Sequence, residues 1–222
     1  MKPLAHSYSA IKQFEDCPQR YYRQRILKDV VDSGGEASIH GDRIHKYIEE
    51  RLRSHTPLPD EAEKFEPLCR SIELAMGDKT EIFTEKELTL NERLEPTDWW
   101  AWDAWLRSKL DVLIMRGEKA LVLDWKTGKR RPDFFQMELF AAQVFKHFPQ
   151  VNQVTTMLVW LRDMASDTET YHREKDSQRL WETILGKIRR IYDAAEHDVW
   201  PAKPSGLCHY CPAQSSCAWA LK

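Results

Sequence analysis

The stretch Leu121-Val-Leu-Asp124-Trp-Lys126-Thr-Gly128 joins an apolar run to an acid, a lysine and a glycine in close succession. The apolar run and the glycine after it predict a buried strand over residues 119–125. Because side chains along a strand alternate between its two faces, Asp124 and Lys126 are expected to share one face. An acid and a cation would then stand side by side at the end of a strand.

A second acid, Asp111, interrupts the apolar stretch 109–115. Gly117 marks a turn between the two stretches, which predicts a hairpin that brings Asp111 and Asp124 to the same end of neighbouring strands. Two carboxylates this close repel each other unless a cation lies between them, and burying either one unpaired is costly. Oxygen ligands so arranged suit Mg²⁺ or Mn²⁺, and Lys126 would orient a water or stabilise the transition state.

The periodicity of the remaining sequence predicts an α/β fold, with a mixed sheet, a helix inserted before its fifth strand, and a helical N-terminal region. Further strands are expected at 81–90, 99–106 and 154–161, with an edge strand at 168–172. Helices are expected from Ser9 to about residue 27 and over 38–54, 60–76, 133–148 and 177–195. By character the chain divides into a helical region (1–80), a core (81–200) and a cysteine-rich tail (201–222), which we expect to form one compact unit.

Composition excludes several classes of protein. The 222 residues are 42% hydrophobic and 31% charged, which is typical of a globular chain and excludes a disordered or fibrous one. With 33 basic and 35 acidic residues the net charge is −2, so a polyanion would be bound by a local groove and not by a basic tail. No apolar run is long enough to span a bilayer and no signal peptide is recognisable, so a cytosolic protein is expected.

The five cysteines are an odd number, and without a secretion signal they favour metal or cluster ligation over disulfides. Cys208-x-x-Cys211-x5-Cys217 is a compact trio, and Cys17 is the candidate for a fourth ligand. A four-cysteine zinc site fits the same ligands, His209 would also suit zinc, and reduced, unligated thiols are the third interpretation. Cys69 lies in an apolar helical stretch and is predicted to be a core residue.

These residues occur in the order of a known set of motifs. The chain resembles the PD-(D/E)XK nuclease superfamily, and in particular its RecB-like branch. The resemblance rests on Asp111, on Asp124-Trp-Lys126, on Gly41-Asp-Arg-Ile-His45, on Gln136-Met-Glu-Leu-Phe140, and on Ser7-Tyr-Ser9 followed by Cys17-Pro-Gln-Arg-Tyr21. Phe140 stands where the branch usually has a tyrosine, so a hydroxyl that would contact the substrate is missing.

The resemblance implies a restriction-endonuclease-like sheet and a metal-dependent DNA nuclease. It assigns Mg²⁺ or Mn²⁺ to His45, Asp111, Asp124 and the carbonyl of Trp125, with Lys126 and Gln136 completing the catalytic set. Phosphodiester hydrolysis would start from DNA ends or single strands, in recombination, repair or defence. Lys126 would then act on a polyanionic substrate beside the metal ion that these residues hold.

The cysteines extend the resemblance to iron–sulfur nucleases, namely the CRISPR adaptation exonucleases and the nuclease subunits of AddAB-type complexes. In that group one N-terminal and three C-terminal cysteines hold a 4Fe–4S cluster that fastens the two chain ends together. The resemblance therefore implies such a cluster on Cys17, Cys208, Cys211 and Cys217, with Zn²⁺ as the alternative. Without a ligand the tail is expected to be disordered, because it has few apolar residues of its own.

Two basic segments are candidates for DNA contact. Lys129, Arg130 and Arg131 follow the acidic strand and would bind phosphates, or else form a solvated charge run. Arg20 and Tyr21 belong to a second stripe in which tyrosine would stack on bases of single-stranded DNA or pack in the core. The tryptophans of 99–105 are expected to be structural.

Two other functions remain open on the sequence alone. One is a non-catalytic DNA-binding subunit of a helicase–nuclease complex, although every proposed catalytic residue is present. The other is a zinc-stabilised restriction-type endonuclease. The sequence has no phosphate-binding G-x-x-x-x-G-K-[ST] motif, so any unwinding would come from a helicase partner.

Overall fold

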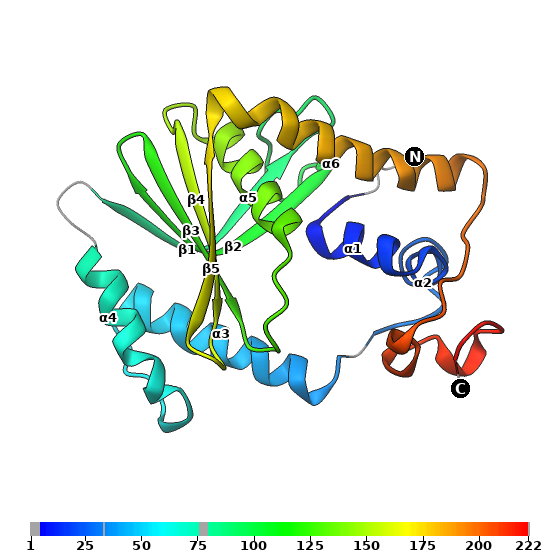
Figure 1. The fold of residues 1–222 in the computed structure, drawn as a ribbon, viewed down its shortest axis with the longest axis horizontal. Helices are drawn as coiled ribbons and strands as arrows, with labels where there is room; N and C mark the ends of the chain where they lie inside the picture. The colour runs from blue at the N-terminus through cyan, green and yellow to red at the C-terminus, as the bar shows by residue number, and fades with distance from the viewer. Residues whose placement is uncertain (1–4, 33, 76–79, 222) are drawn as a thin grey trace. The chain divides into compact units, whose positions relative to one another are not determined.

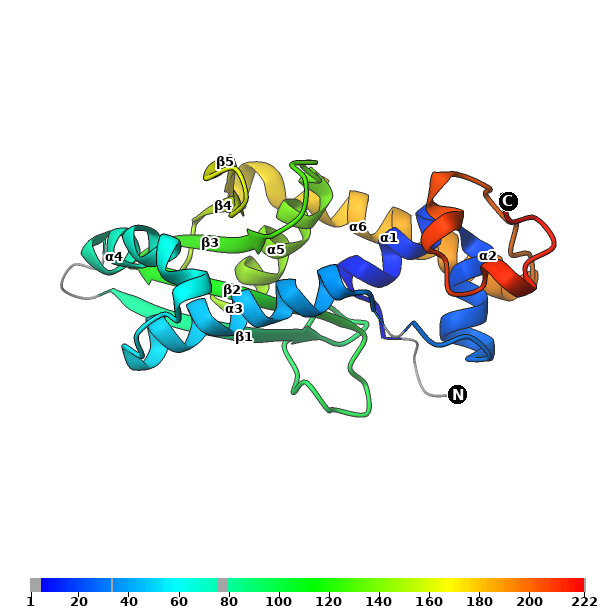
Figure 2. The same ribbon diagram turned by 90° about the horizontal axis from the view of Figure 1, so that it is seen from below.

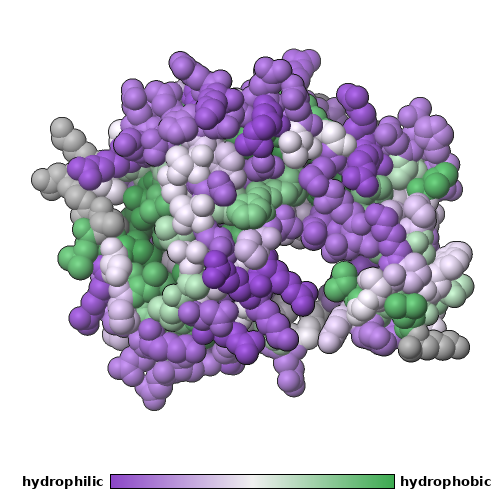
Figure 3. Space-filling model, viewed as in Figure 1, coloured by the Kyte–Doolittle hydropathy of each residue, from purple (hydrophilic) through white to green (hydrophobic). Residues whose placement is uncertain are grey.

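The computed structural model describes residues 5–32, 34–75 and 80–221. They form two compact units (Figure 1). The first contains residues 35–75, 80–181 and Ala5, and the second contains residues 6–32, 34 and 182–221. Cys17 and His45 therefore belong to different units. In the described parts of the chain no helix combines the length and apolar character needed to cross a bilayer, and the face drawn in Figure 3 is mostly hydrophilic.

The first unit is built on a mixed sheet with the strand order β1-β2-β3-β4-β5. The strands are β1 Glu81–Leu90, β2 Leu106–Arg116, β3 Lys119–Lys126, β4 Gln153–Trp160 and β5 Ala165–His172. β3 and β4 run parallel, and all other neighbours are antiparallel. A parallel pair needs a crossover, and helix α5, Phe134–His147, lies between β3 and β4 in the chain. The hairpin predicted at Gly117 is confirmed, because Arg116 of β2 pairs with Lys119 of β3. Gly117 lies in the turn between them with a φ of +58°, which glycine adopts without strain.

Helices cover both faces of this sheet (Figures 1 and 2). Helix α3 (Glu36–Ser54), the 3₁₀ helix η2 (Asp60–Phe65) and helix α4 (Glu66–Ala75) lie on one face, and α5 lies on the other. The core under α3 and α4 includes Ile44, Ile48, Leu52, Phe65, Cys69 and Ile72 from the helices and Val112, Ile114, Leu123, Trp125 and Val159 from the strands. Cys69 is fully buried there, as the sequence predicted.

The second unit joins the N-terminal helices to the C-terminal tail. It contains α1 (Tyr8–Asp16), α2 (Pro18–Tyr21), the π-helix η1 (Tyr22–Leu27), the part of α6 (Arg173–Glu196) from Glu182 onward, and the 3₁₀ helices η3 (Gly206–Tyr210) and η4 (Gln214–Ser216). Gln19 N donates to Pro201 O at 3.3 Å, and Lys203 Nζ donates to Glu15 O at 2.8 Å. The ring of Tyr21 stacks on Trp200 with centroids 6.0 Å apart.

The α/β fold with its mixed sheet is confirmed, but two predicted elements are wrong. The N-terminal helix is broken at Cys17, because Pro18 disfavours a helical conformation in the residue before it. Ser7, and not Ser9, caps α1 by accepting the amide of Ala10.

The second error concerns the strand expected at 99–106. Residues 99–105 belong to the loop of residues 91–105, and β2 begins only at Leu106. Asn91 Oδ1 accepts the amides of Arg93 and Glu95 at the start of this loop, and Trp105 N donates to Leu90 O at its end. The alternating tryptophans imitate a strand pattern, yet Trp100 and Trp102 are 82% and 80% exposed.

Candidate active site

Asp124 and Lys126 lie on one face at the end of β3, as their spacing predicted. Lys126 Nζ is 2.6 Å from Asp124 Oδ2. Gln136, in the first turn of α5, donates from Nε2 to Asp124 Oδ1 at 2.9 Å. Asp133 caps that helix by accepting the amide of Phe135, which sets where the first turn begins. The carboxylate is thus held between a cation and an amide.

Burial dominates the electrostatics of Asp124, whose exposed fraction is 6%. Desolvation raises the pKa of Asp124 to about 6, the ammonium of Lys126 opposes this rise, and the negative charge of Asp111 adds to it. The buried carboxylate is therefore a group that a nearby positive charge would stabilise.

Asp111 lies where β2 diverges from β3, and its side chain takes the place of a backbone contact between the two strands. The backbone pairing between these strands ends at Val112 opposite Leu123. Beyond that pair, Asp111 Oδ2 accepts the amide of Trp125 at 2.7 Å, and its Oδ1 lies 3.5 Å from His45 Nδ1 of α3. The predicted convergence of two acids and His45 at one end of the sheet is thus present in the geometry.

His45 is held near the two acids by α3. Burial acts to lower the pKa of His45, but the carboxylates of Asp111 and Asp124 outweigh it, and the pKa lies above its usual value. The imidazole is therefore tuned by the same negative charges that would attract a metal ion.

The donor chemistry fits a hard divalent cation. Two carboxylates and an imidazole meet at the strand ends, and Asp124 Oδ2 is a buried oxygen that receives no well-formed hydrogen bond from the described residues beside its charge contact with Lys126. No three His, Cys, Asp or Glu side chains in the described ranges are already close enough together to enclose a metal ion. The site therefore has suitable ligands, but they would have to move closer together to surround a metal ion.

Gly41 has a steric role that the sequence did not reveal. A Cβ atom added at Gly41 would lie 2.9 Å from Thr127 Oγ1, and Thr127 directly follows Lys126. Helix α3, which carries His45, therefore approaches the end of β3 so closely that an alanine at position 41 would require the Thr127 hydroxyl to move. Only the folded contact identifies Thr127 as part of the site.

We expect Gly41→Ala to lower the nuclease activity that the sequence motifs imply, because it pushes Thr127 and its neighbour Lys126 out of place. Thr127→Ala removes the atom that clashes, so the double variant should regain activity, with a coupling free energy of about 1 kcal/mol in thermal unfolding. Gly186→Ala in α6 is the control, since no atom lies within 4 Å of its added Cβ, and it should stabilise the protein by about 0.5–1 kcal/mol. Independent effects of the Gly41 and Thr127 substitutions would contradict this contact.

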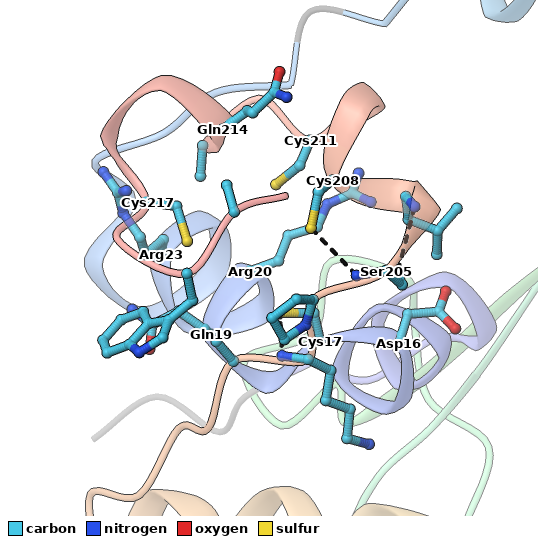
Figure 4. Close-up of a pocket in the computed structure, with 17 residues that line it drawn as sticks. Asp16, Cys17, Gln19, Arg20, Arg23, Ser205, Cys208, Cys211, Gln214 and Cys217 are labelled. Carbon is cyan, nitrogen blue, oxygen red and sulfur yellow. Dashed lines mark hydrogen bonds between the residues drawn. The ribbon is translucent and has the colours of Figure 1, made fainter. Parts of the chain in front are cut away.

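The four candidate cysteine ligands line one pocket in the second unit (Figure 4). All five cysteines of the chain are free thiols. The pocket has about 550 Å³ of space, part of it open to solvent. The amide of Lys203 donates to Cys17 Sγ at 3.5 Å and that of Ser205 to Cys208 Sγ at 3.4 Å. The Ser205 amide, followed by that of Leu221, lowers the pKa of the Cys208 thiol.

Arg23 is a pocket residue that sequence reasoning missed. It lies on the π-helix η1 and donates from Nη1 to Ser216 Oγ at 2.8 Å, next to Cys217. It also pairs with Asp29 at 2.8 Å. Its charge faces Cys217 and Cys211, which suits thiolates.

Of the residues predicted to contact DNA, some are exposed, some form ion pairs and one is buried. Arg130 forms an ion pair with Asp167, while Lys129 and Arg131 are exposed beside β3. Arg20 pairs with Asp32 at 2.9 Å. Tyr21 is fully buried between Phe14 and Trp200, which corrects the base-stacking role because no face of its ring is open to a nucleotide.

Comparison with known proteins bears on the whole arrangement. The family model of the PD-(D/E)XK nuclease superfamily matches residues 5–218. The crystal structure named "Putative exonuclease" from Eubacterium rectale aligns with 99% of this chain and 90% of its own, at 14% identity and a TM-score of 0.54. That of SSO0001 aligns with 100% of this chain and 90% of its own, at 12% identity and a TM-score of 0.46. No curated protein matches the sequence.

Proposed function

Because the chain belongs to the PD-(D/E)XK nuclease superfamily, we propose that it is a metal-dependent deoxyribonuclease that hydrolyses phosphodiester bonds at the end of β3. The single observation that supports this most is the buried Asp124, held between Lys126 and Gln136 and adjacent to Asp111. A carboxylate kept buried with this much nearby charge needs a functional reason.

In this proposal Asp111, Asp124, His45 and the carbonyl of Trp125 hold Mg²⁺ or Mn²⁺. When bound, such an ion supplies Lewis-acid chemistry and neutralises charge on the phosphate. Asp111 is already oriented by the Trp125 amide at 2.7 Å, so little reorganisation is required of it. Gln136 fixes the rotation of the Asp124 carboxylate by donating to its Oδ1, while Oδ2 lies beside the Lys126 ammonium.

Lys126 has two tasks in the proposed reaction. Before substrate and metal bind, its ammonium neutralises Asp124 at 2.6 Å and thereby lowers the cost of burying that carboxylate. With the substrate present, the same ammonium is free to orient the attacking water and to stabilise negative charge that develops on the phosphate. The exposed Lys129 and Arg131 would bind flanking phosphates, and Arg130 would join them after leaving Asp167.

Beyond this activity we propose membership of the RecB-like branch, action from DNA ends or on single strands, and a helicase partner for duplex substrates. We further propose that Cys17, Cys208, Cys211 and Cys217 hold a 4Fe–4S cluster, with Zn²⁺ as the alternative. Four thiols around one pocket, with backbone amides donating to two of them, support a ligand-binding role.

The test of the activity is digestion of matched linear and circular DNA, each single- and double-stranded, with Mg²⁺, Mn²⁺ or EDTA. We expect cleavage of end-labelled linear DNA with either metal, no cleavage in EDTA, and protection of the circles. Cleavage of circular DNA would show that the protein does not need a DNA end, so that it would be an endonuclease and not an exonuclease. Binding of all four DNAs without cleavage under any metal would favour the non-catalytic subunit.

A further inference from the structure

Along strands β1 and β2, the side chains switch from one face of the sheet to the other partway along the hairpin. Val112 and Ile114 of β2 pack in the core under α3 and α4. Ser108 of the same strand accepts a hydrogen bond from Gln143 Nε2 of α5 at 3.0 Å, on the other face of the sheet. Residues four apart on a regular strand share a face, so the alternation is broken between Ser108 and Val112. Asp111 lies within this break.

The break has a backbone origin on the partner strand. Thr84 pairs with Val112 and Lys86 pairs with Leu110, which leaves Glu85 opposite Asp111 without a pairing of its own. Glu85 has a φ of +51°, in the left-handed region that a residue with a side chain rarely adopts. The register is the same on both sides of Glu85, so no residue is inserted, and the break is a local rotation of the backbone and not a bulge.

The flanking residues of β1 show the same reversal. Ile82 packs against the core under α3 and α4, whereas Leu88 lies opposite Ser108, on the side of α5. Residues six apart on a regular strand would share a face. Both strands therefore rotate at one level, the level of Glu85 and Asp111.

We propose that Glu85 is a positioning residue whose left-handed backbone turns Asp111 out of the regular alternation and toward His45 and the Trp125 amide. This inference rests on the proposed function, in which Asp111 is a metal ligand. Without the break, the alternation set by Val112 and Ile114 would turn Asp111 to the α5 face of the sheet, away from His45 of α3. Strained backbone held in place by its surroundings is typical of functional sites.

The side chain of Glu85 has a separate and lesser role. Its carboxylate forms an ion pair with Lys109, an exposed residue of β2. Such surface pairs contribute little to stability. The backbone and the charge can therefore be tested apart, because glycine keeps the left-handed conformation while removing the carboxylate, and glutamine keeps the side-chain size without the charge.

The experiment measures Mn²⁺ affinity by calorimetry, together with thermal unfolding, for Glu85→Gly, Glu85→Gln and Glu85→Val. We expect Glu85→Gly and Glu85→Gln to bind Mn²⁺ like the wild type. We expect Glu85→Val to bind about tenfold or more weakly, because a β-branched residue rejects positive φ and Asp111 is then misplaced. Should Glu85→Val not fold, Glu85→Asn and Glu85→Thr provide a milder pair with the same contrast.

Two outcomes would overturn the inference and are distinguishable from failure of the proposed function. Wild-type Mn²⁺ affinity in folded Glu85→Val, or in folded Glu85→Thr, would show that the left-handed backbone at Glu85 does not position Asp111. Equal loss of affinity in Glu85→Gly and Glu85→Val would assign the effect to the carboxylate and not to the backbone. If Asp111→Ala itself binds Mn²⁺ normally, the proposed metal site fails instead.

Discussion

Asp124→Ala is expected to abolish metal-dependent DNA cleavage, with a loss of at least about 10²- to 10³-fold in rate, the size of effect that follows removal of one preorganised electrostatic group. The reason is that Asp124 is a proposed metal ligand that Gln136 at 2.9 Å and Lys126 at 2.6 Å already hold in position. Lys126→Ala should lose a comparable amount. The measurement is the initial rate on end-labelled DNA across a range of Mn²⁺ concentrations.

The control is Asp163→Ala, an exposed acid that should leave the rate unchanged. Thermal melting separates loss of chemistry from loss of fold, and it has a defined pH dependence. Because the pKa of Asp124 is raised to about 6 in the fold, the metal-free fold loses stability as the pH rises from about 4, the usual pKa of Asp, to about 6, and it stays at the lower level above that pH. Asp124→Asn should therefore melt higher than the wild type at pH 8 and equally at pH 4. Cleavage at the wild-type rate by Asp124→Ala would contradict the assigned site.

Cys17→Ser and Cys208→Ser are each expected to remove iron and labile sulfide from anaerobically purified protein, which should be brown in the wild type. Each change removes one of four thiols from the pocket of Figure 4. Loss of the ligand should also expose the tail from Pro201 to protease, because ligand binding is the main source of order in a segment with so few apolar residues. Metal and sulfide analysis, visible absorption and limited proteolysis provide the measurements.

Cys69→Ser is the matched control, because Cys69 is fully buried in the core of the other unit and should change neither colour nor tail protection. Colourless anaerobic protein with one equivalent of zinc would replace the cluster with a zinc site and leave the nuclease proposal intact. Protein that holds neither metal while its tail resists protease would contradict the ligand assignment.

Most of the sheet could be predicted from local patterns. The strands around Asp111 and Asp124 were predictable because each is an apolar run bounded by turn signals, and α5 because its apolar residues recur at helical spacing. The segment 99–106 misled because bulky aromatics at alternating positions imitate a strand, while the hydrogen bonds of Asn91 that close the loop depend on folded geometry.

The sequence by itself determined which residues could do chemistry here. Asp124 and Lys126 are two apart on a strand, and a strand has a period of two, so their position on one face follows from spacing alone. The same is true of the hairpin that brings Asp111 to the level of Asp124, because a turn at Gly117 fixes which residues face each other.

Tertiary structure alone decided how those residues are held. Gly41 lies close against the Thr127 hydroxyl, Arg23 lines the cysteine pocket, Tyr21 is buried away from any nucleotide, and Glu85 breaks the alternation that a sequence pattern assumes. Each of these depends on a contact between segments distant in the chain or on a backbone angle that no residue type announces. Sequence periodicity reports only the face to which a side chain points within one regular element, whereas close approach, burial and left-handed backbone arise when elements pack together.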